Sequence, residues 1–327
     1  MPDLIKVFAS CVRGMLVPDS GKVIQSFDFA AIESRVNAWL FDEQWKLQAF
    51  RDYDAGTGPD MYCMTYGRAF RVDPRTIGKD DPRRQNGKVQ DLAFGYEGGV
   101  SALTEWATLY RIDLAEMASS VRQVLSPDIV ESAEWMWQKF GRSSGLSHDV
   151  YIGCDGVKQL WRRLHPRIVQ GWKDLKAAAV LAVENPGTVY KLPNGKLAFK
   201  VESDWLYMRL PSGRKLAYFK PEVEGDVVSH LGVDTVTRRW MRTQNYGGKW
   251  CERACQSVSR DLLVHAMFGL EAQGYDTIGT VHDEVLSEVD ERFGSLEEAR
   301  SIMCKLPEWA YGLPVAAAGW RAKRYRK

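Results

Sequence analysis

The hydrophobic periodicity of the chain switches between strand and helix in an order that limits the available folds. Residues 21–29, "GKVIQSFDF", alternate polar and apolar side chains, which is typical of a strand. Apolar residues then recur with helical spacing from residue 30 to about residue 185. Alternation returns at 186–225, where Pro-Asn-Gly and Pro-Ser-Gly turns indicate hairpins. This order predicts an α+β fold with an α-helical lobe inserted after the first strand and helix.

The last part of the chain again mixes helix and strand. Helical spacing covers 249–273, and a strand pair with a central turn follows in "TIGTVHDEVLSEVD" at 277–290. A final helix is predicted in "LEEARSIMCKLPEW" at 296–309. Strands at both ends of the sequence therefore enclose the helical insertion, and we expect them to share one sheet.

Composition excludes a membrane-spanning protein. The longest apolar run, "AAAVLAV" at 177–183, is far short of the roughly 20 residues that cross a bilayer. The N-terminal "MPDLIKVFAS" lacks the pattern of an export signal. Six cysteines are scattered without a CxxC pair, which favours reduced thiols in a cytoplasmic protein.

Charge is nearly balanced overall but unevenly distributed. The net charge is only +2, which does not by itself indicate a nucleic-acid partner. Basic residues nevertheless gather at 80–88, 237–242 and 319–327, and the last stretch carries five cations, two aromatics and no acid. Such clusters are typical either of solvated surface or of contact with nucleic acid, and charge alone leaves both open.

Two aspartates stand where strands end or turn. Asp28 closes the strand at 21–29, and Asp283 lies inside the strand pair at 277–290. A buried, unpaired carboxylate costs several kcal/mol, so each needs water, a cationic partner or a metal ion. Two carboxylates on neighbouring strands suit Mg²⁺, and paired ions support phosphoryl transfer. The alternative is that each aspartate caps a turn or pairs with an arginine.

A stripe of four residues marks one face of the helix predicted at 80–99, which opens on Asp-Pro and closes on Gly-Gly. Arg84, Lys88, Leu92 and Tyr96 recur at every fourth position. The two cations suit a polyphosphate, and the two apolar side chains offer surface to a sugar or base. An amphipathic helix with solvated cations is the alternative, but the order along the stripe favours a nucleotide.

Three motifs in the expected order resemble those of family A DNA polymerases, the bacterial DNA polymerase I class. "FDFAAIESRV" (27–36) is similar to motif A, and "RRQNGKVQDLAFGYEGG" (83–99) is similar to motif B, above all in the phage and prophage branch. "VHDEV" (281–285) is similar to motif C. Further segments that resemble the same branch are "LPSGRKLAY" (210–218), "CQSVSRDLL" (255–263) and "GWRAKRYRK" (319–327).

The resemblance implies a polymerase architecture. Residues 1–45 and 236–327 would form the two parts of a palm with an antiparallel sheet. Residues 46–185 would form the helical fingers, and 186–235 an insertion of β-hairpins.

The resemblance also implies the reaction, a DNA-directed DNA polymerase core that joins a dNTP to a primer 3′-hydroxyl. Two Mg²⁺ ions, for which Mn²⁺ can substitute, would be held by Asp28 and Asp283 with the backbone carbonyl of Phe29. Glu284 would lie beside the metal ions in a supporting role.

Substrate contacts follow from the same motifs. Arg84 and Lys88 would bind the triphosphate, and Lys88 would protonate the departing pyrophosphate. Glu33 would exclude a 2′-hydroxyl, backed by Tyr96. Leu92 stands where many relatives have an aromatic residue, so discrimination against 3′-deoxy analogues should differ.

Primer-template DNA is the implied macromolecular partner. His282 and Gln256 would face the primer terminus and the minor groove, whose hydrogen-bond acceptors are similar for all base pairs. Arg35, at the side of the helix predicted at 30–41, is also assigned to DNA contact.

Motif A begins at residue 27, which leaves no room before it for the thumb or exonuclease that relatives carry there. We therefore expect no proofreading. The chain would be either a fragment or a core that receives its thumb, or thumb and exonuclease, from a separate polypeptide. A phage or prophage origin would place it in the cytoplasm of a bacterial host.

Two other functions remain as alternatives. One is a catalytically silent protein with a polymerase fold that binds DNA or regulates, and the intact Asp28, Asp283, Arg84 and Lys88 weigh against it. The other is an RNA polymerase or reverse transcriptase, which Glu33 disfavours.

Overall fold

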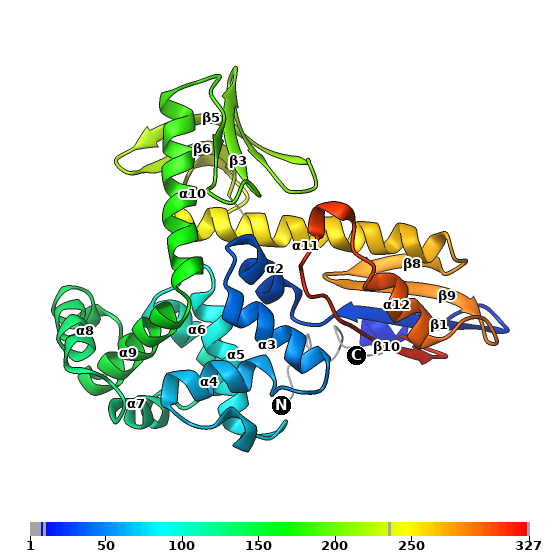
Figure 1. Cartoon of the computed structure of the whole chain (residues 1–327), viewed down its shortest axis with the longest axis horizontal. Coiled ribbons are helices and arrows are strands. Elements are labelled where there is room, and N and C mark those ends of the chain that lie inside the picture. The colour runs from blue at the N-terminus through cyan, green and yellow to red at the C-terminus, as the bar shows by residue number, and fades with distance from the viewer. Residues whose placement is uncertain (1–7, 9–10, 235–236, 326–327) are drawn as a thin grey trace. The chain divides into compact units, whose positions relative to one another are not determined.

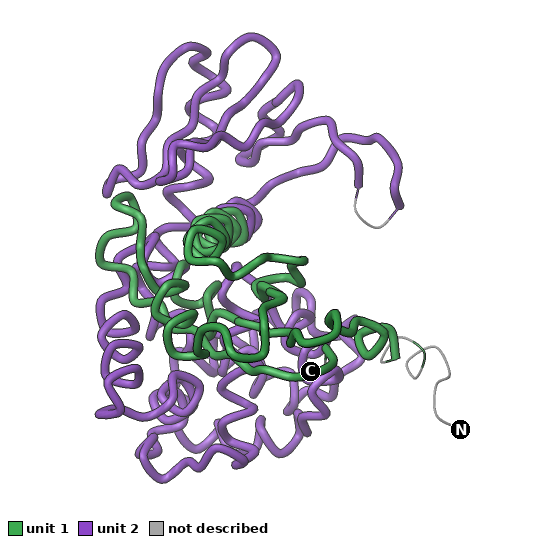
Figure 2. Tube along the Cα trace, turned by 90° about the vertical axis from the view of Figure 1, so that its right-hand side faces the viewer, with its two compact units in different colours: residues 1–36, 256–327 green, residues 37–255 purple. Residues whose placement is uncertain are grey.

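The computed structural model describes Phe8, residues 11–234 and residues 237–325 of an α+β protein (Figure 1). The chain divides into two compact units, Met1–Val36 with Gln256–Lys327 and Asn37–Cys255 (Figure 2). Both boundaries fall inside helices, α2 (Ile32–Leu40) and α11 (Gly247–Glu271). The boundaries between palm and fingers that we expect near residues 45 and 236 remain predictions.

The first unit is built on a four-stranded antiparallel sheet. Its strand order is β10-β1-β9-β8, so the first strand lies between two strands from the far end of the sequence. A short helix, α12, packs against β10 and β1. The sheet therefore joins the two ends of the chain, as the sequence pattern predicts. The elements are β1 (Lys22–Phe29), β8 (Asp276–Val281), β9 (Glu284–Asp290), α12 (Leu296–Met303), η3 (Glu308–Ala310) and β10 (Ala317–Ala322).

Alternation along these strands explains their place in the sheet. Phe27 and Val285 are buried partners on one face of the β1–β9 pair. Ile24 and Leu286 form a buried cluster with Tyr325 on the other face. Buried apolar side chains thus lie on both faces of the β1–β9 pair, which places these two strands in the interior of the unit.

Helices dominate the second unit. Asp60, Asp81 and Asp113 accept hydrogen bonds from backbone N–H groups at the starts of α4, α5 and α7, so local capping fixes where these helices begin. The elements are α3 (Gln44–Asp54), α4 (Met61–Phe70), η1 (Pro74–Thr76), α5 (Pro82–Phe94), α6 (Val100–Tyr110), α7 (Leu114–Arg122), α8 (Pro127–Lys139), η2 (Gly141–Ser143), α9 (His148–Leu164) and α10 (Pro166–Glu184).

The predicted hairpins form a six-stranded antiparallel sheet in sequence order, which lies beside α10 (Figure 1). The Pro-Asn-Gly and Pro-Ser-Gly turns join β2 to β3 and β4 to β5, as predicted. The sheet continues beyond residue 236, because β7 pairs with β6 as far as Asn245. Its strands are β2 (Tyr190–Lys191), β3 (Ala198–Glu202), β4 (Trp205–Arg209), β5 (Lys215–Glu224), β6 (Val227–Val233) and β7 (Trp240–Asn245).

The helix that carries the stripe ends earlier than its Gly-Gly pair suggests. α5 stops at Phe94, and Tyr96 lies in the turn beyond it. The carbonyl of Gly95 accepts a hydrogen bond from Asn37 Nδ2 at 2.9 Å, and Glu97 adopts a left-handed backbone with φ of 65°. A side-chain donor thus takes the place of the next helical N–H, and the prediction of a helix to residue 99 was wrong.

The cysteines fit the expectation of reduced thiols. All six lie in the described part of the chain, and none of them forms a disulfide there. Cys251 and Cys255 lie one turn apart on the buried face of α11, with their Sγ atoms 4.0 Å apart. Burial raises the pKa of Cys63 to about 11 and that of Cys154 to about 12, so both stay protonated thiols at neutral pH. Within the described residues, no helix is long and apolar enough to span a bilayer.

Candidate active site

The predicted acidic residues meet at one end of the four-stranded sheet. Asp28, near the end of β1, is the register partner of Glu284 at the start of β9. The backbone N–H of Phe29 donates to the carbonyl of Asp283 at 3.5 Å. Directly opposed residues of an antiparallel pair point to the same face, so the Asp28 and Glu284 carboxylates share one side of the sheet. The pairing of Asp28 with Glu284 thus brings together residues 256 positions apart.

A two-residue turn presents the other two ionisable groups. His282 and Asp283 connect β8 to β9, and Val281 pairs with Glu284 across the turn. His282 has a φ of 57°, a left-handed conformation that costs a non-glycine residue about 1 kcal/mol. Its side chain is exposed and Asp283 is partly exposed. The hairpin therefore keeps a strained backbone while it presents an imidazole and a carboxylate to solvent.

Glu284, in contrast, is buried and fully engaged. Its Oε1 accepts a hydrogen bond from the Ser26 hydroxyl, and its Oε2 accepts one from the Tyr325 hydroxyl at 2.9 Å. Burial, and next the hydrogen bond to Glu284, raise the pKa of Tyr325, so the phenol remains a donor. Both carboxylate oxygens are thus directed toward protein hydroxyls, which fits a supporting role better than direct metal ligation.

Tyr325 and Ser26 were not identified from the sequence. Ser26 lies two residues before Asp28 and so on the same strand face, a signal that alternation along β1 contains. Tyr325 belongs to the basic tail, and its ring stacks with that of Trp320, with 5.8 Å between the ring centres. Its backbone N–H donates to the carbonyl of Leu16 at 3.0 Å. No local pattern in the sequence indicates these contacts. Arg326 and Lys327 of the same tail lie outside the described residues.

The donor set suits a hard divalent cation. Asp28 and Asp283 offer partly exposed carboxylates on adjacent segments, and Phe29 adds a backbone carbonyl. Mg²⁺ is usually held by one or two carboxylates and keeps its remaining positions for water and substrate phosphates. Among the described residues, no group of three or more His, Cys, Asp or Glu side chains is arranged as a closed metal cage. A two-carboxylate, solvent-facing set therefore fits Mg²⁺ rather than a structural zinc site.

α2 places its two predicted residues differently. Glu33 is exposed in the first turn of the helix. Arg35 is almost fully buried, and its guanidinium donates to the carbonyls of Ala30 at 2.7 Å and Pro314 at 3.4 Å. Arg35 thus secures the turn between β1 and α2. This location disagrees with the expected DNA contact, because the Arg35 guanidinium is buried and donates to backbone carbonyls inside the unit.

Gln256, the other residue expected near the primer, lies on α11 with its side chain exposed. The neighbouring Cys255 and Val258 are buried, so the helix presents Gln256 on its solvent side. The position is compatible with a contact to DNA.

The nucleotide stripe lies in the second unit, on α5. Arg84, Lys88 and Leu92 are partly exposed along one face, whereas most positions between them are buried. Lys88 Nζ lies 4.8 Å from the centre of the Tyr110 ring, a cation–π contact. Tyr96 follows the helix end and is partly exposed. The cations thus lie on one regular helix, one turn apart.

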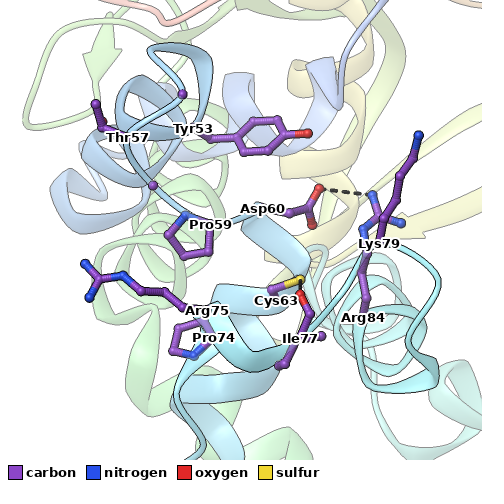
Figure 3. A pocket seen from close by; sticks show the side chains of 12 residues that line it. Tyr53, Thr57, Pro59, Asp60, Cys63, Pro74, Arg75, Ile77, Lys79 and Arg84 are labelled. Carbon is purple, nitrogen blue, oxygen red and sulfur yellow. Dashed lines mark hydrogen bonds and ion pairs between the residues drawn. The ribbon is translucent and has the colours of Figure 1, made fainter.

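Arg84 borders a cavity of about 420 Å³ in the same unit (Figure 3). Its guanidinium donates to Asp60 Oδ2 at 3.0 Å and lies 5.3 Å from the centre of the Tyr62 ring. Asp60 also caps α4, since its Oδ1 accepts from the Tyr62 N–H at 2.8 Å. A phosphate that binds Arg84 must therefore compete with a fixed carboxylate. Sequence reasoning missed Asp60 in this role, although its place as a helix cap was predictable.

The fold is similar to that of one solved structure, the POL domain of Pol1 from M. smegmatis in complex with DNA primer-template and dNTP. That comparison has a TM-score of 0.54 and 14% identity, and it covers 96% of this chain and 42% of the other.

The amino-acid sequence is similar to those of phage DNA polymerases. The chain is 34% identical over 328 residues to the DNA polymerase of Bacillus phage SP02, covering 98% of this chain and 44% of that protein. It is 36% identical over 94 residues to the DNA polymerase of Mycobacterium phage D29, covering 29% of this chain and 14% of that protein. No protein-family profile matches the chain. The predicted resemblance to the phage branch is confirmed, and the chain spans less than half the length of these relatives.

Proposed function

We propose that the chain is the catalytic core of a DNA-directed DNA polymerase that adds dNTPs to a primer 3′-hydroxyl without proofreading. The observation that carries the proposal is the β1–β9 register, which sets Asp28 beside the Asp283–Glu284 hairpin. Similarity to phage DNA polymerases over 98% of the chain supports the choice of substrate.

The acidic end of the sheet would hold two Mg²⁺ ions, or Mn²⁺ in their place. Asp28, Asp283 and the Phe29 carbonyl would be the protein ligands. When bound, the two ions would activate the primer 3′-hydroxyl for attack on the α-phosphate and stabilise the leaving oxygen. Glu284, held by the Tyr325 hydroxyl at 2.9 Å, would fix the orientation of the hairpin that carries Asp283.

α5 would bind the triphosphate. Arg84 offers a planar fork and Lys88 a compact charge, and the two lie one helical turn apart. Lys88 would donate a proton to the departing pyrophosphate, and its contact with the Tyr110 ring would hold the ammonium in position. Leu92, next along the same face, would contact the nucleotide sugar.

Selectivity and primer contacts would come from exposed side chains. Glu33 would occupy the space of a 2′-hydroxyl, with Tyr96 behind it, and so favour deoxynucleotides. His282 and Gln256, both exposed, would contact the primer end and the minor groove.

The partners would be primer-template DNA and dNTPs in the cytoplasm of a bacterial host. Because the relatives are more than twice as long as this chain, we propose that a thumb-bearing polypeptide contributes to the grip on duplex DNA. Loss of that grip should show as weak, salt-sensitive binding, since phosphate contacts release counterions.

A primer-extension assay with Mg²⁺ and dNTPs tests the proposal. Asp28→Ala and Asp283→Ala should each abolish extension. Asp290→Ala is the matched control, because this exposed aspartate lies at the opposite end of β9, and it should extend like the unmodified chain.

The same assay distinguishes an active polymerase core from a catalytically silent protein with a polymerase fold. Extension that appears only after a thumb-bearing polypeptide is added supports the split core. A chain that binds primed DNA but never extends it, with or without that polypeptide and in excess over template, is instead a silent DNA-binding protein with a polymerase fold.

A further inference from the structure

The six-stranded sheet has two faces of different character. On the inner face, Leu206, Met208 and Tyr218 are buried. The Tyr218 ring lies 4.7 Å from that of Trp250, and the Phe199 ring lies 5.3 Å from it. This face therefore supplies the apolar core beneath the sheet, and the side chains of the opposite face are not needed for it.

The outer face carries a row of aromatic side chains across three strands. Trp205 on β4 is the register partner of Phe219 on β5, and their rings are 4.8 Å apart. The Phe219 ring lies 6.5 Å from that of Trp240 on β7. Trp240 is 60% exposed and Trp205 is also exposed. Large aromatic surfaces thus remain in solvent on a sheet that is already packed on its other side.

Cations are interleaved with these rings. Lys220 Nζ lies 5.6 Å from the Phe219 ring centre, and Lys215 Nζ lies 5.2 Å from that of Tyr207. Arg242 lies opposite Leu231 on the adjacent strand. The outer face therefore offers flat apolar surface and positive charge within the same few ångströms.

The acids on this face are already engaged. Glu222 accepts a hydrogen bond from Arg242 at 2.6 Å, and Glu202 pairs with Lys200 at 2.7 Å. Lys215 lies 3.9 Å from Glu202 and is half exposed, so it stays available to a second anion. Arg238 and Arg239, just before β7, add two exposed cations. The face is thus net positive, which favours a polyanionic ligand.

Exposed rings beside cations are how sequence-tolerant sites bind single-stranded nucleic acid. Unpaired bases stack on aromatic side chains, and the backbone phosphates meet lysine and arginine. A duplex would offer phosphates but no free base faces, so it would leave the row of rings unused. Stacking on aromatic rings does not depend on the base sequence, because every base has a π-face.

We propose that the outer face of β4–β7 is a binding surface for single-stranded DNA, with bases stacked on Trp205, Phe219 and Trp240. Lys215 and Lys220 would contact the phosphates. The choice of DNA as the occupant rests on the proposed function, whereas the stacking platform rests on the sheet itself.

Fluorescence anisotropy with a labelled dT20 oligonucleotide in EDTA tests the surface without metal-dependent binding at the acids. Trp240→Ala and Trp205→Ala should each weaken binding about 5- to 140-fold, the range for loss of one stacked base. Trp240→Tyr should restore most of the affinity. Trp135→Ala is the matched control, because Trp135 is 57% exposed on α8 with Lys139 Nζ 4.8 Å from its ring, and it should bind like the unmodified chain.

The salt dependence and the competitor sharpen the result. Lys220→Ala should reduce the slope of log Kd against log salt by about 0.7, the value for one phosphate contact on a single strand. Unlabelled dT20 should compete better than duplex of the same length. Equal loss in Trp135→Ala, or stronger competition by duplex, would overturn the proposal. Far-UV circular dichroism and thermal unfolding confirm that each variant is folded.

Failure of this surface is distinguishable from failure of the polymerase proposal. Asp283→Ala should lose primer extension and retain dT20 binding. If the chain extends primers but substitution of the three rings leaves its dT20 affinity unchanged, only the binding-surface proposal is refuted. If the chain binds dT20 through these rings but does not extend primers, only the polymerase proposal is refuted.

Discussion

A buried ion pair between α3 and α5 gives the sharpest test of how the nucleotide helix is held. Lys46 Nζ lies 2.5 Å from Asp91 Oδ1, and the two side chains are only 2% and 5% exposed. The Trp161 indole N–H donates to the same oxygen at 3.4 Å, and its ring lies 5.8 Å from the ammonium. Because α5 carries Arg84 and Lys88, the pair positions the cations expected to bind triphosphate.

Removing one partner leaves the other charge buried without its counter-ion. This should lower the free energy of unfolding by about 3–5 kcal/mol. We expect about 4 kcal/mol for Lys46→Met, since the Asp91 carboxylate loses its ammonium at 5% exposure. We expect about 3 kcal/mol for Asp91→Asn, because the amide oxygen still accepts from Lys46. The double variant Lys46→Met/Asp91→Leu should recover most of the loss, because an apolar pair of similar volume needs no solvation.

Urea unfolding followed by far-UV circular dichroism gives the free energies. Hydrogen exchange of α3 and α5 peptides shows where the structure opens. Lys176→Met is the control, because Lys176 and Asp226 are 2.6 Å apart but their side chains are 35% and 81% exposed. Solvent screens that exposed pair, so its loss should lower the free energy of unfolding far less than the loss of the buried pair. An Asp91→Asn loss as small as the control's would refute the reasoning, as would a double variant that shows the full sum of the single losses.

Three further outcomes are expected. His282→Gly should stabilise the hairpin by about 1 kcal/mol in thermal unfolding, because glycine tolerates a φ of 57°. The same variant should extend primers more slowly. Unchanged extension would show that the imidazole is not part of the site. Asp60→Asn should lower the KM for dNTP several-fold in steady-state extension, because Arg84 is released from its ion pair, and a higher KM would contradict this. Burial lowers the pKa of His165 to about 3 and that of His230 to about 4, so below about pH 6.5 the unfolded chain takes up protons that the folded chain does not. Stability should therefore fall as pH drops from 6.5 toward these values, by up to about 1.4 kcal/mol per pH unit for each histidine, and His165→Asn should flatten the curve in urea unfolding at pH 5 to 7.

Local physics explains the parts of the fold that the sequence predicts. Alternation places Asp28 near the end of β1, and the short apolar strands around Asp283 predict the β8–β9 hairpin. Asp81 followed by proline marks the start of α5, where its side chain accepts from the Arg83 N–H at 2.8 Å. In each case the determining contacts lie within a few residues, so a single sequence contains them.

The remaining features depend on partners far away in the chain. Arg35 has the spacing of a helix-flank cation, but the carbonyl of Pro314, 279 positions away, accepts its hydrogen bond inside the unit. In the sequence, Tyr325 is one of two aromatics in a basic tail, and the pairing of β10 with β1 brings it to Glu284. The early end of α5 likewise depends on Asn37, 58 positions before Gly95. The hydrophobic periodicity of a sequence does not predict contacts between residues so far apart in the chain.

The position of β1 between β9 and β10 has a consequence for biosynthesis. β1 is made first, and roughly 250 residues follow before its partner Glu284 emerges. At about 5–20 residues per second, this strand waits on the order of 10–50 s with both edges unpaired. Unpaired edges are prone to aggregate, so a nascent chain should depend on chaperones mainly through this one strand. The second unit, whose segments are contiguous, can fold in the meantime. The acidic site is therefore among the last parts of the molecule to form.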